Sequence, residues 1–170
     1  MKFSMLAILG VAAATTTATV ATTDNLVDGV YLTTTTSGTP QYELVNTTDP
    51  VAAAPQIRGR GLLNARVDRS FACSGVNLND NDLYHAMHNL AAVFKNGYTL
   101  TNPSISSVYG TVKVFVCNYN GNAGSAWTSS KVWGKNTEVD GNCGKDIAGH
   151  INEPKGEGNF GRTFATDHFC

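Results

Sequence analysis

The pattern of apolar and polar positions is clearest between residues 79 and 97, where it has the period of a helix. The polar run from Asn79 to Asp82 is typical of a helix start, because its side chains can accept hydrogen bonds from unpaired backbone N–H groups. Asn96-Gly97 is typical of a helix end. The expected buried stripe consists of Leu83, Met87, Leu90, Ala91 and Phe94.

Alternating apolar and polar positions predict strands elsewhere in the C-terminal part of the chain. The strongest is 108–118, where three valines at every second position are separated by Lys113 and Phe115. We expect further strands at 71–76, 127–135 and 160–170, and a short helix at 144–152. The resulting order is β-α-β-β-α-β, that of a ferredoxin-like split βαβ fold. The predicted class is therefore α+β, with an antiparallel sheet and two helices on one face.

The N-terminal part has a different composition. Residues 1–21 have the pattern of a secretion signal, with Lys2 followed by an apolar stretch at 5–14 and small residues before a cleavage site near Ala21. Residues 22–66 are rich in Thr, Ala and Pro and contain no cysteine. Two strand-like stretches, 30–34 and 41–45, could form a hairpin, but an isolated hairpin is marginal in water. We therefore expect 22–66 to be largely disordered.

Two short motifs in that segment predict processing. Leu63-Asn64-Ala65-Arg66 resembles the Leu-x-x-Arg site at which fungal secreted toxins and effectors lose a pro-segment, although a basic linker would look the same. Asn46-Thr47-Thr48 is a glycosylation sequon. The expected organisation is a signal peptide (1–21), a pro-segment (22–66) and a mature domain (67–170).

The four cysteines, Cys73, Cys117, Cys143 and Cys170, all lie in the mature domain. An even number of cysteines behind an export signal predicts disulfides, and four cysteines allow three pairings. Because the first and last strands of the expected topology can be neighbours, we favour Cys73–Cys170, which leaves Cys117–Cys143. The chain has no Cys-x-x-Cys pair, so redox catalysis has little support.

Charge and composition exclude several classes of binding partner. A net charge of −1 with no basic cluster argues against nucleic acid and against polybasic membrane binding. No stretch after the signal has the apolar length of a membrane helix. His85 and His88 could share a helix edge with Asp82 and hold a metal, but a solvated polar face is the favoured interpretation. We expect no metal and no cofactor.

One set of residues could perform acid–base chemistry. His150, Glu153, Arg162 and His168 include the base, acid and cation that a secreted ribonuclease needs. Phe71-Ala72-Cys73 before a helix, with a late cysteine, is similar to the start of ribonuclease-like fungal effectors. The catalytic pattern of the ribonucleases is not visible, so we assign no catalytic residue and treat ribonuclease activity as the alternative.

A broader resemblance covers residues 73–170, which look like the necrosis-inducing-factor-type effectors of fungi, a family related to small killer toxins. Tyr84 lies near the place of a helix cysteine of that family. The resemblance depends on the order of short motifs: Cys73, His88-Asn89-Leu90, Tyr109-Gly110-Thr111, Gly141-Asn142, Asp146-Ile147, Ile151, Phe160-Gly161 and Cys170.

This resemblance implies a secreted, monomeric effector that modulates plant immunity or cell death by binding a host protein without catalysis. It would act in the host apoplast or inside the host cell. The alternatives are a ribonuclease-like RNA-binding effector, active or inactive, and a killer-toxin-like antimicrobial protein.

Overall fold

The computed structural model describes residues 26–36, 39–45, 69–153 and 158–170. The predicted signal peptide, the sequon at Asn46 and the processing motif from Leu63 to Arg66 lie outside these residues. Removal of the pro-segment therefore stays a prediction.

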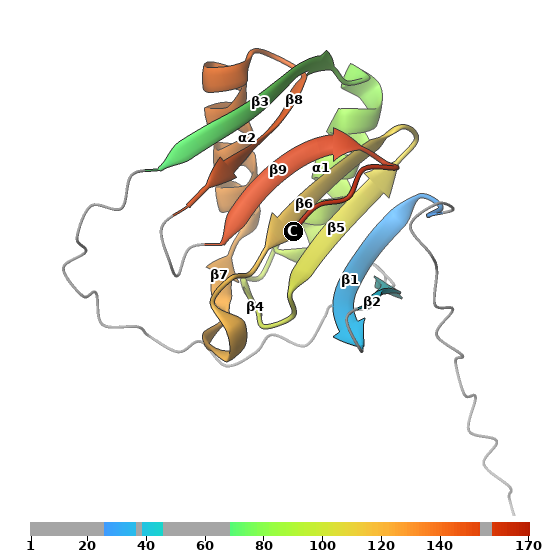
Figure 1. Ribbon diagram of the computed structural model, residues 1–170, viewed down its shortest axis with the longest axis vertical. Coiled ribbons are helices and arrows are strands. Elements are labelled where there is room, and N and C mark those ends of the chain that lie inside the picture. Colours follow the sequence, from blue (N-terminus) through green and yellow to red (C-terminus); the bar gives the residue numbers. More distant parts are fainter. Residues whose placement is uncertain (1–25, 37–38, 46–68, 154–157) are drawn as a thin grey trace, which may run out of the picture.

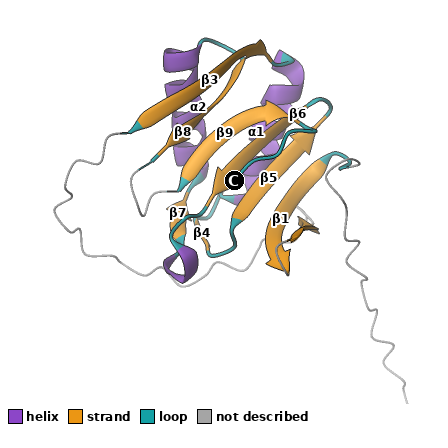
Figure 2. Ribbon diagram, viewed as in Figure 1, coloured by secondary structure: helices purple, strands orange, loops and turns teal. Residues whose placement is uncertain are grey.

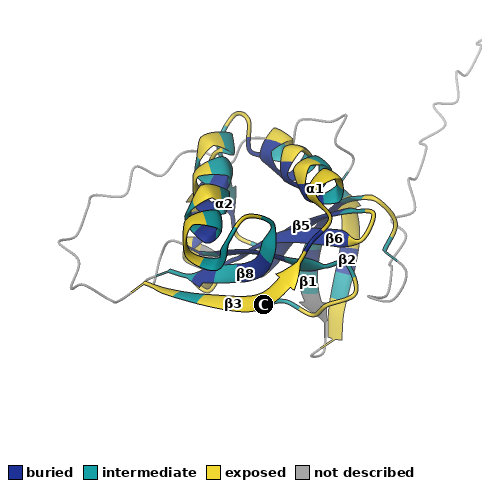
Figure 3. Ribbon diagram, turned by 90° about the horizontal axis from the view of Figure 1, so that it is seen from above, coloured by how far each residue is buried: buried dark blue, intermediate teal, exposed yellow. Residues whose placement is uncertain are grey.

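The described residues form one seven-stranded sheet with both helices packed on the same face (Figures 1 and 3). The strand order across the sheet is β2-β1-β5-β6-β9-β8-β3, and neighbouring strands are antiparallel. The strands of this sheet are β1 (Gly29–Thr36), β2 (Thr39–Val45), β3 (Ser70–Asn77), β5 (Ser104–Tyr109), β6 (Val112–Cys117), β8 (Ile147–Asn152) and β9 (Asn159–Phe164).

Two helices and a small second sheet complete the fold (Figure 2). Helix α1 spans Asp80–Val93 and helix α2 spans Ser129–Cys143. The second sheet pairs β4 (Tyr98–Leu100) with β7 (Ser125–Trp127), and a short 3-10 turn, η2, covers Gly121–Ala123. The α+β class is confirmed. The ferredoxin-like arrangement is not confirmed, because the sheet has seven strands in a different order.

Helix α1 follows the sequence prediction closely. Asn79 caps it by accepting a hydrogen bond from the backbone N–H of Asp82 at 3.0 Å. The predicted stripe is buried, with Leu90 and Phe94 both fully inaccessible to solvent. It packs on the valines of β6 and on Ile105, Ile151 and Phe160 of the other central strands. This layer between the helices and the sheet is the main core.

The strand predicted at 108–118 is in fact a hairpin of β5 and β6. Its turn lies at Gly110, which has a positive φ of 53° that favours glycine. Asp82 of α1 fixes the turn by accepting hydrogen bonds from the backbone N–H and the hydroxyl of Thr111, each at 2.9 Å. A side chain at Gly110 would collide with the Asp82 carboxylate. The contact between the turn and the start of α1 therefore requires a glycine at position 110.

Two predicted elements have the wrong type. Residues 127–135 were expected to be a strand, but the strand ends at Trp127 and the chain turns into α2, which Thr128 caps by accepting from the N–H of Lys131. Residues 144–152 were expected to be a helix, but they hold a turn and then strand β8. Positive φ angles at Gly144 (104°) and Asp146 (59°) form that turn and prevent a helix.

The N-terminal hairpin was predicted, but it is not loose. Strand β1 pairs with β2 and, on its other side, with β5 of the main sheet. Val30 is buried in the main core, and Tyr31 and Tyr42 form a second cluster with Val108 on the opposite face. The expectation of disorder is therefore wrong for residues 29–36 and 39–45.

Candidate functional site

The face of the sheet away from the helices carries the candidate site. Strand side chains alternate between the two faces, so Val112, Val114 and Val116 of β6 point to the helices while the residues between them point away. The residues of the central strands on this open face are Lys113, Phe115 and Cys117 of β6, Asn159, Gly161 and Thr163 of β9, and His150 and Asn152 of β8.

The end of the chain crosses this face as a segment that we call the C-terminal strap, residues 165–170 (Figure 1). The strand predicted at 160–170 thus ends at Phe164. The backbone N–H of Asp167 donates a hydrogen bond to the carbonyl of Phe164, and this bond closes a turn that reverses the chain. Phe169 stacks on Phe115 with ring centroids 4.8 Å apart. Cys170 is disulfide-bonded to Cys117 of the central strand. The strap is therefore held covalently and by aromatic packing.

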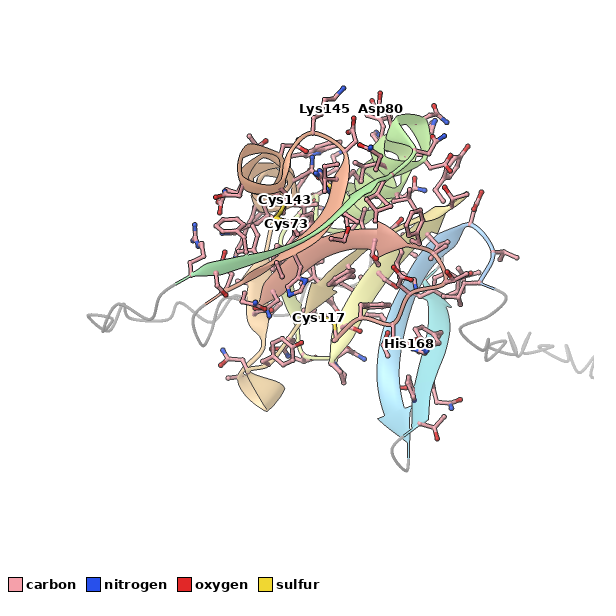
Figure 4. All side chains as sticks on the ribbon, turned by 45° about the horizontal axis from the view of Figure 1, so that its top comes forward. Cys73, Asp80, Cys117, Cys143, Lys145 and His168 are labelled. Atoms are coloured by element: carbon pink, nitrogen blue, oxygen red, sulfur yellow. A yellow bond between two sulfur atoms is a disulfide. The ribbon has the colours of Figure 1, made fainter. Side chains whose placement is uncertain are left out.

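Both cysteine pairings differ from the prediction. The structure pairs Cys73 with Cys143 (Cα–Cα 5.3 Å) and Cys117 with Cys170 (Cα–Cα 5.6 Å). Figure 4 shows Cys73 and Cys143 together where β3 meets the end of α2. The predicted pairing assumed that Cys143 precedes a helix near the central strand, whereas it ends α2 over strand β8. Two disulfides fit an oxidising compartment.

Lys113 lies beneath the strap and is fully buried. Its ammonium donates to the backbone carbonyl of Asp167 at 2.8 Å and lies 4.8 Å from the centre of the Phe169 ring. Burial lowers the pKa of Lys113 from 10.5 to about 8, and the carboxylate of Asp167 opposes that change. Asp167 also accepts hydrogen bonds from the Thr163 hydroxyl and, at 3.3 Å, from the Phe164 N–H.

Between the strap and strands β8 and β3 lies a cavity of about 670 Å³, within the range of small-ligand sites. Its lining combines small apolar and aromatic residues with polar residues, most of which are uncharged. The side chains that matter below are Tyr119, His150, Asn152, Asn159, Thr163 and His168. Tyr119 is 64% exposed at the start of the loop after β6. His168 lies on the strap side of the sheet (Figure 4).

Two asparagines in this lining hold the ends of β8 and β9 together. The Asn159 amide donates to the Asn152 carbonyl oxygen at 3.0 Å, and the Asn152 amide donates to the hydroxyl of Ser70 at 3.2 Å. The Asn159 oxygen accepts from the backbone N–H of Glu153 at 2.8 Å. These bonds fix the position of both amides.

Gly161 provides room for the aromatic floor of this face. A Cβ placed there would lie 2.3 Å from the Phe115 ring and 2.7 Å from the Cβ of His150. Such separations are far below van der Waals contact, so Phe115 and His150 can lie over β9 only because residue 161 has no side chain.

The predicted acid–base set is divided by the sheet. His150 and His168 line the cavity, whereas Glu153 and the guanidinium of Arg162 are engaged elsewhere. Arg162 donates to the carbonyls of Ile147 and Gly144 and to Asn136, and pairs with Asp140 at 2.6 Å. These contacts attach the end of α2 to the sheet.

Glu153 belongs to a second ion-pair network. Its buried carboxylate contacts the ammonium of Lys135 from α2 and, at 3.0 Å, the guanidinium of Arg69. Arg69 also pairs with Glu138 at 2.8 Å. The charges of two cationic and two anionic side chains thus cancel in one cluster. The cluster connects α2, the end of β8 and the start of β3, so its role is structural.

The residues that were considered as metal ligands, Asp82, His85 and His88, do not form a metal site in the described part of the chain. The Asp82 carboxylate is engaged by Thr111, and His85 stacks on Tyr109 with ring centroids 4.5 Å apart. Within the described ranges, no three His, Cys, Asp or Glu side chains lie close enough together to hold a metal ion. Trp127 is buried in the core, whereas Tyr119 is exposed at the cavity.

The strap and the two hydrogen-bonded amides of Asn152 and Asn159 were missed by the sequence analysis.

Comparison of the chain with protein-family models, with curated proteins and with solved structures finds no match. Neither helix in the described part of the chain is long and apolar enough to cross a membrane.

Proposed function

We propose that the chain is a secreted effector that acts on a plant host by binding a host component at the open-face cavity, without catalysis. The single observation that carries this proposal is the cavity bounded by a strap cross-linked to the central strand through Cys117–Cys170. A wall held by a covalent bond loses little conformational freedom when a ligand binds, which favours recognition.

Three further features support the proposal. The N-terminal pattern of a secretion signal agrees with the two disulfides, since both belong to exported proteins. The short motifs shared with necrosis-inducing-factor-type effectors provide the host context. Glu153 and Arg162, which catalysis would require beside the histidines, are held in ion pairs away from them.

The test is infiltration of plant tissue with the secreted protein and with two cavity variants, Tyr119→Ala and His150→Ala. The matched control is Tyr84→Ala, because Tyr84 is 56% exposed on α1, on the other face of the sheet. We expect the tissue response to be lost in the cavity variants and kept in the control. A response that all three variants retain, or no response to the wild type, would refute the proposal. Growth arrest of competing fungi without a plant response would favour the toxin alternative.

One observation favours a second candidate, a ribonuclease-like protein: His150 and His168 line the same cavity. Two histidines across one substrate could serve as base and acid for cleavage at a 2′-hydroxyl. Metal-independent cleavage of total RNA that is lost in His150→Ala and kept in Tyr84→Ala would establish this candidate and would replace the non-catalytic proposal.

A further inference from the structure

The cavity lining also indicates the chemical class of its ligand. We propose that the cavity binds a neutral oligosaccharide, an inference that rests on the proposed function and specifies the host component. It follows from three properties of the described lining: the charges are engaged, the polar groups that remain are both donors and acceptors, and an aromatic ring lies at the rim.

The charges come first. Apart from the histidines, Arg162 and Asp167 are the charged residues that contribute to the lining among the residues that the structure describes, and the Arg162 side chain points to the helix side of the sheet. All three guanidinium nitrogens of Arg162 have partners on the helix side, and Asp167 accepts from Thr163 and Phe164. Phosphate and carboxylate ligands require available Arg, Lys or clustered backbone N–H groups. The lining therefore favours an uncharged ligand over an anionic one.

The remaining polar groups match sugar hydroxyls. An amide has two N–H donors and two oxygen lone pairs. The hydrogen bonds among the described residues use one N–H and one lone pair on both Asn152 and Asn159. One donor and one acceptor thus remain on each amide, and both amides are already fixed by the bonds that they make. A hydroxyl of a sugar donates and accepts at the same time, so it can satisfy both.

The third property is an aromatic surface. A pyranose ring has an apolar C–H face, which packs well on the ring of a tyrosine or phenylalanine while its hydroxyls reach polar groups beside it. Tyr119, largely exposed at the cavity, supplies such a ring in the same lining as the two asparagines. A volume of about 670 Å³ accommodates a short oligosaccharide.

The experiment titrates the secreted protein, uniformly labelled with ¹⁵N, with defined probes at pH 7. Neutral probes are hexamers of β-1,3-glucan, β-1,4-glucan and chitin together with a mannose-rich N-glycan, which separate cell-wall sources from glycoprotein sources. The anionic probes are an oligogalacturonate and an RNA hexamer. We expect at least one neutral probe to shift the amide resonances of Asn152 and Asn159, and the anionic probes to leave them unchanged.

Variants then test the role of the ring. Tyr119→Ala should weaken binding of the active neutral probe roughly five- to tenfold, as loss of one stacked ring does. The matched control Tyr84→Ala should bind like the wild type. The inference is overturned if no neutral probe shifts the cavity resonances, if only RNA or the oligogalacturonate does, or if both tyrosine variants lose binding equally.

The two proposals fail separately. If Tyr119→Ala abolishes the tissue response while no neutral probe binds, the proposed function stands and the ligand class is wrong. If a neutral probe binds but the wild-type protein produces no tissue response, the glycan site stands and the effector function is wrong.

Discussion

Replacing Tyr31 tests whether the N-terminal hairpin is part of the folded unit. Tyr31 is 2% exposed on β1, and its hydroxyl donates to the Val27 carbonyl at 2.7 Å. It packs with Tyr42 and Val108, the latter from β5 of the main sheet. Truncation of a buried aromatic residue to alanine costs about 3–5 kcal/mol. We therefore expect Tyr31→Ala to lower the free energy of unfolding by about 3 kcal/mol.

Urea unfolding followed by tryptophan fluorescence measures this effect. Trp127 is 1% exposed in the main core, and Trp133 of α2 packs against the same core, so the fluorescence reports unfolding of the domain from positions outside the hairpin. With a urea slope near 2 kcal/mol per molar, the midpoint should fall by about 1.5 M. Tyr31→Phe, which keeps the ring and loses one hydrogen bond, should cost only about 1 kcal/mol.

A disordered hairpin predicts a different outcome. If residues 29–45 contributed nothing to the folded unit, Tyr31→Ala would leave the midpoint unchanged, and the paired sheet edge described above would be refuted. The intact mass of the secreted protein should also be measured by mass spectrometry, because cleavage after Arg66 predicts an N-terminus at Val67. If that cleavage occurs, we expect the hairpin peptide to remain bound to the domain until denaturant is added.

Three other predictions concern the interior. Replacing Cys73 and Cys143 together by serine should cost about 4 kcal/mol, because the disulfide closes a loop with a sequence separation of 70. Lys113→Met should flatten the pH dependence of stability between pH 8 and pH 10.5, where the wild-type unfolded state binds more protons than the folded state and stability therefore rises with pH. Gly161→Ala should cost about 2 kcal/mol, because its Cβ would force Phe115 to move. Urea unfolding measures all three.

Each of these predictions has a control. The double serine variant should keep the Cys117–Cys170 disulfide and contain no free thiol, and free thiols in that variant would contradict the assigned pairing. A wild-type pH slope equal to that of Lys113→Met would show that the lysine is not buried. Gly134 lies on α2 with open space where a Cβ would lie, so Gly134→Ala should stabilise the protein by up to about 1 kcal/mol. Equal changes in the free energy of unfolding for Gly161→Ala and Gly134→Ala would contradict the close packing of Phe115 over Gly161.

Helix α1 could be predicted from sequence because its apolar stripe and its cap agree. Helix α2 could not, since Lys135 occupies a buried position between Val132 and Val139 and interrupts the stripe. The partner that makes this burial possible, Glu153, lies 18 residues further along the chain. Within the sequence of the helix alone, Lys135 looks like an exposed polar position. In the fold it is buried because it is paired with Glu153.

Strand β8 was misassigned because its spacing is ambiguous. Ile147 and Ile151 lie four residues apart, which fits one face of a helix and equally one face of a strand. The turn before it, with its positive φ at Asp146, decided the outcome. Both disulfide pairings depend on where α2 and β8 lie, so these two errors also led to the wrong pairing.

The candidate site was predicted only in part. The two histidines were selected by residue type, but their separation from Glu153 and Arg162 follows from strand alternation across β8 and β9. The strap was invisible because Phe160 to Cys170 has the aromatic and Thr-rich composition of a strand throughout. Only Asp167, whose side chain and backbone close the turn after Phe164, indicates that the strand stops.

The cross-link between Cys117 and Cys170 makes the open face of the sheet sensitive to the redox state of its surroundings. In a cytosol, glutathione and thioredoxin would reduce it, and the end of the strap would then be held only by non-covalent contacts, such as those of Phe169 with Phe115 and of Lys113 with Asp167. One wall of the pocket would be free to leave. We therefore predict that a ligand of this cavity binds outside the cell, where the disulfide stays oxidised.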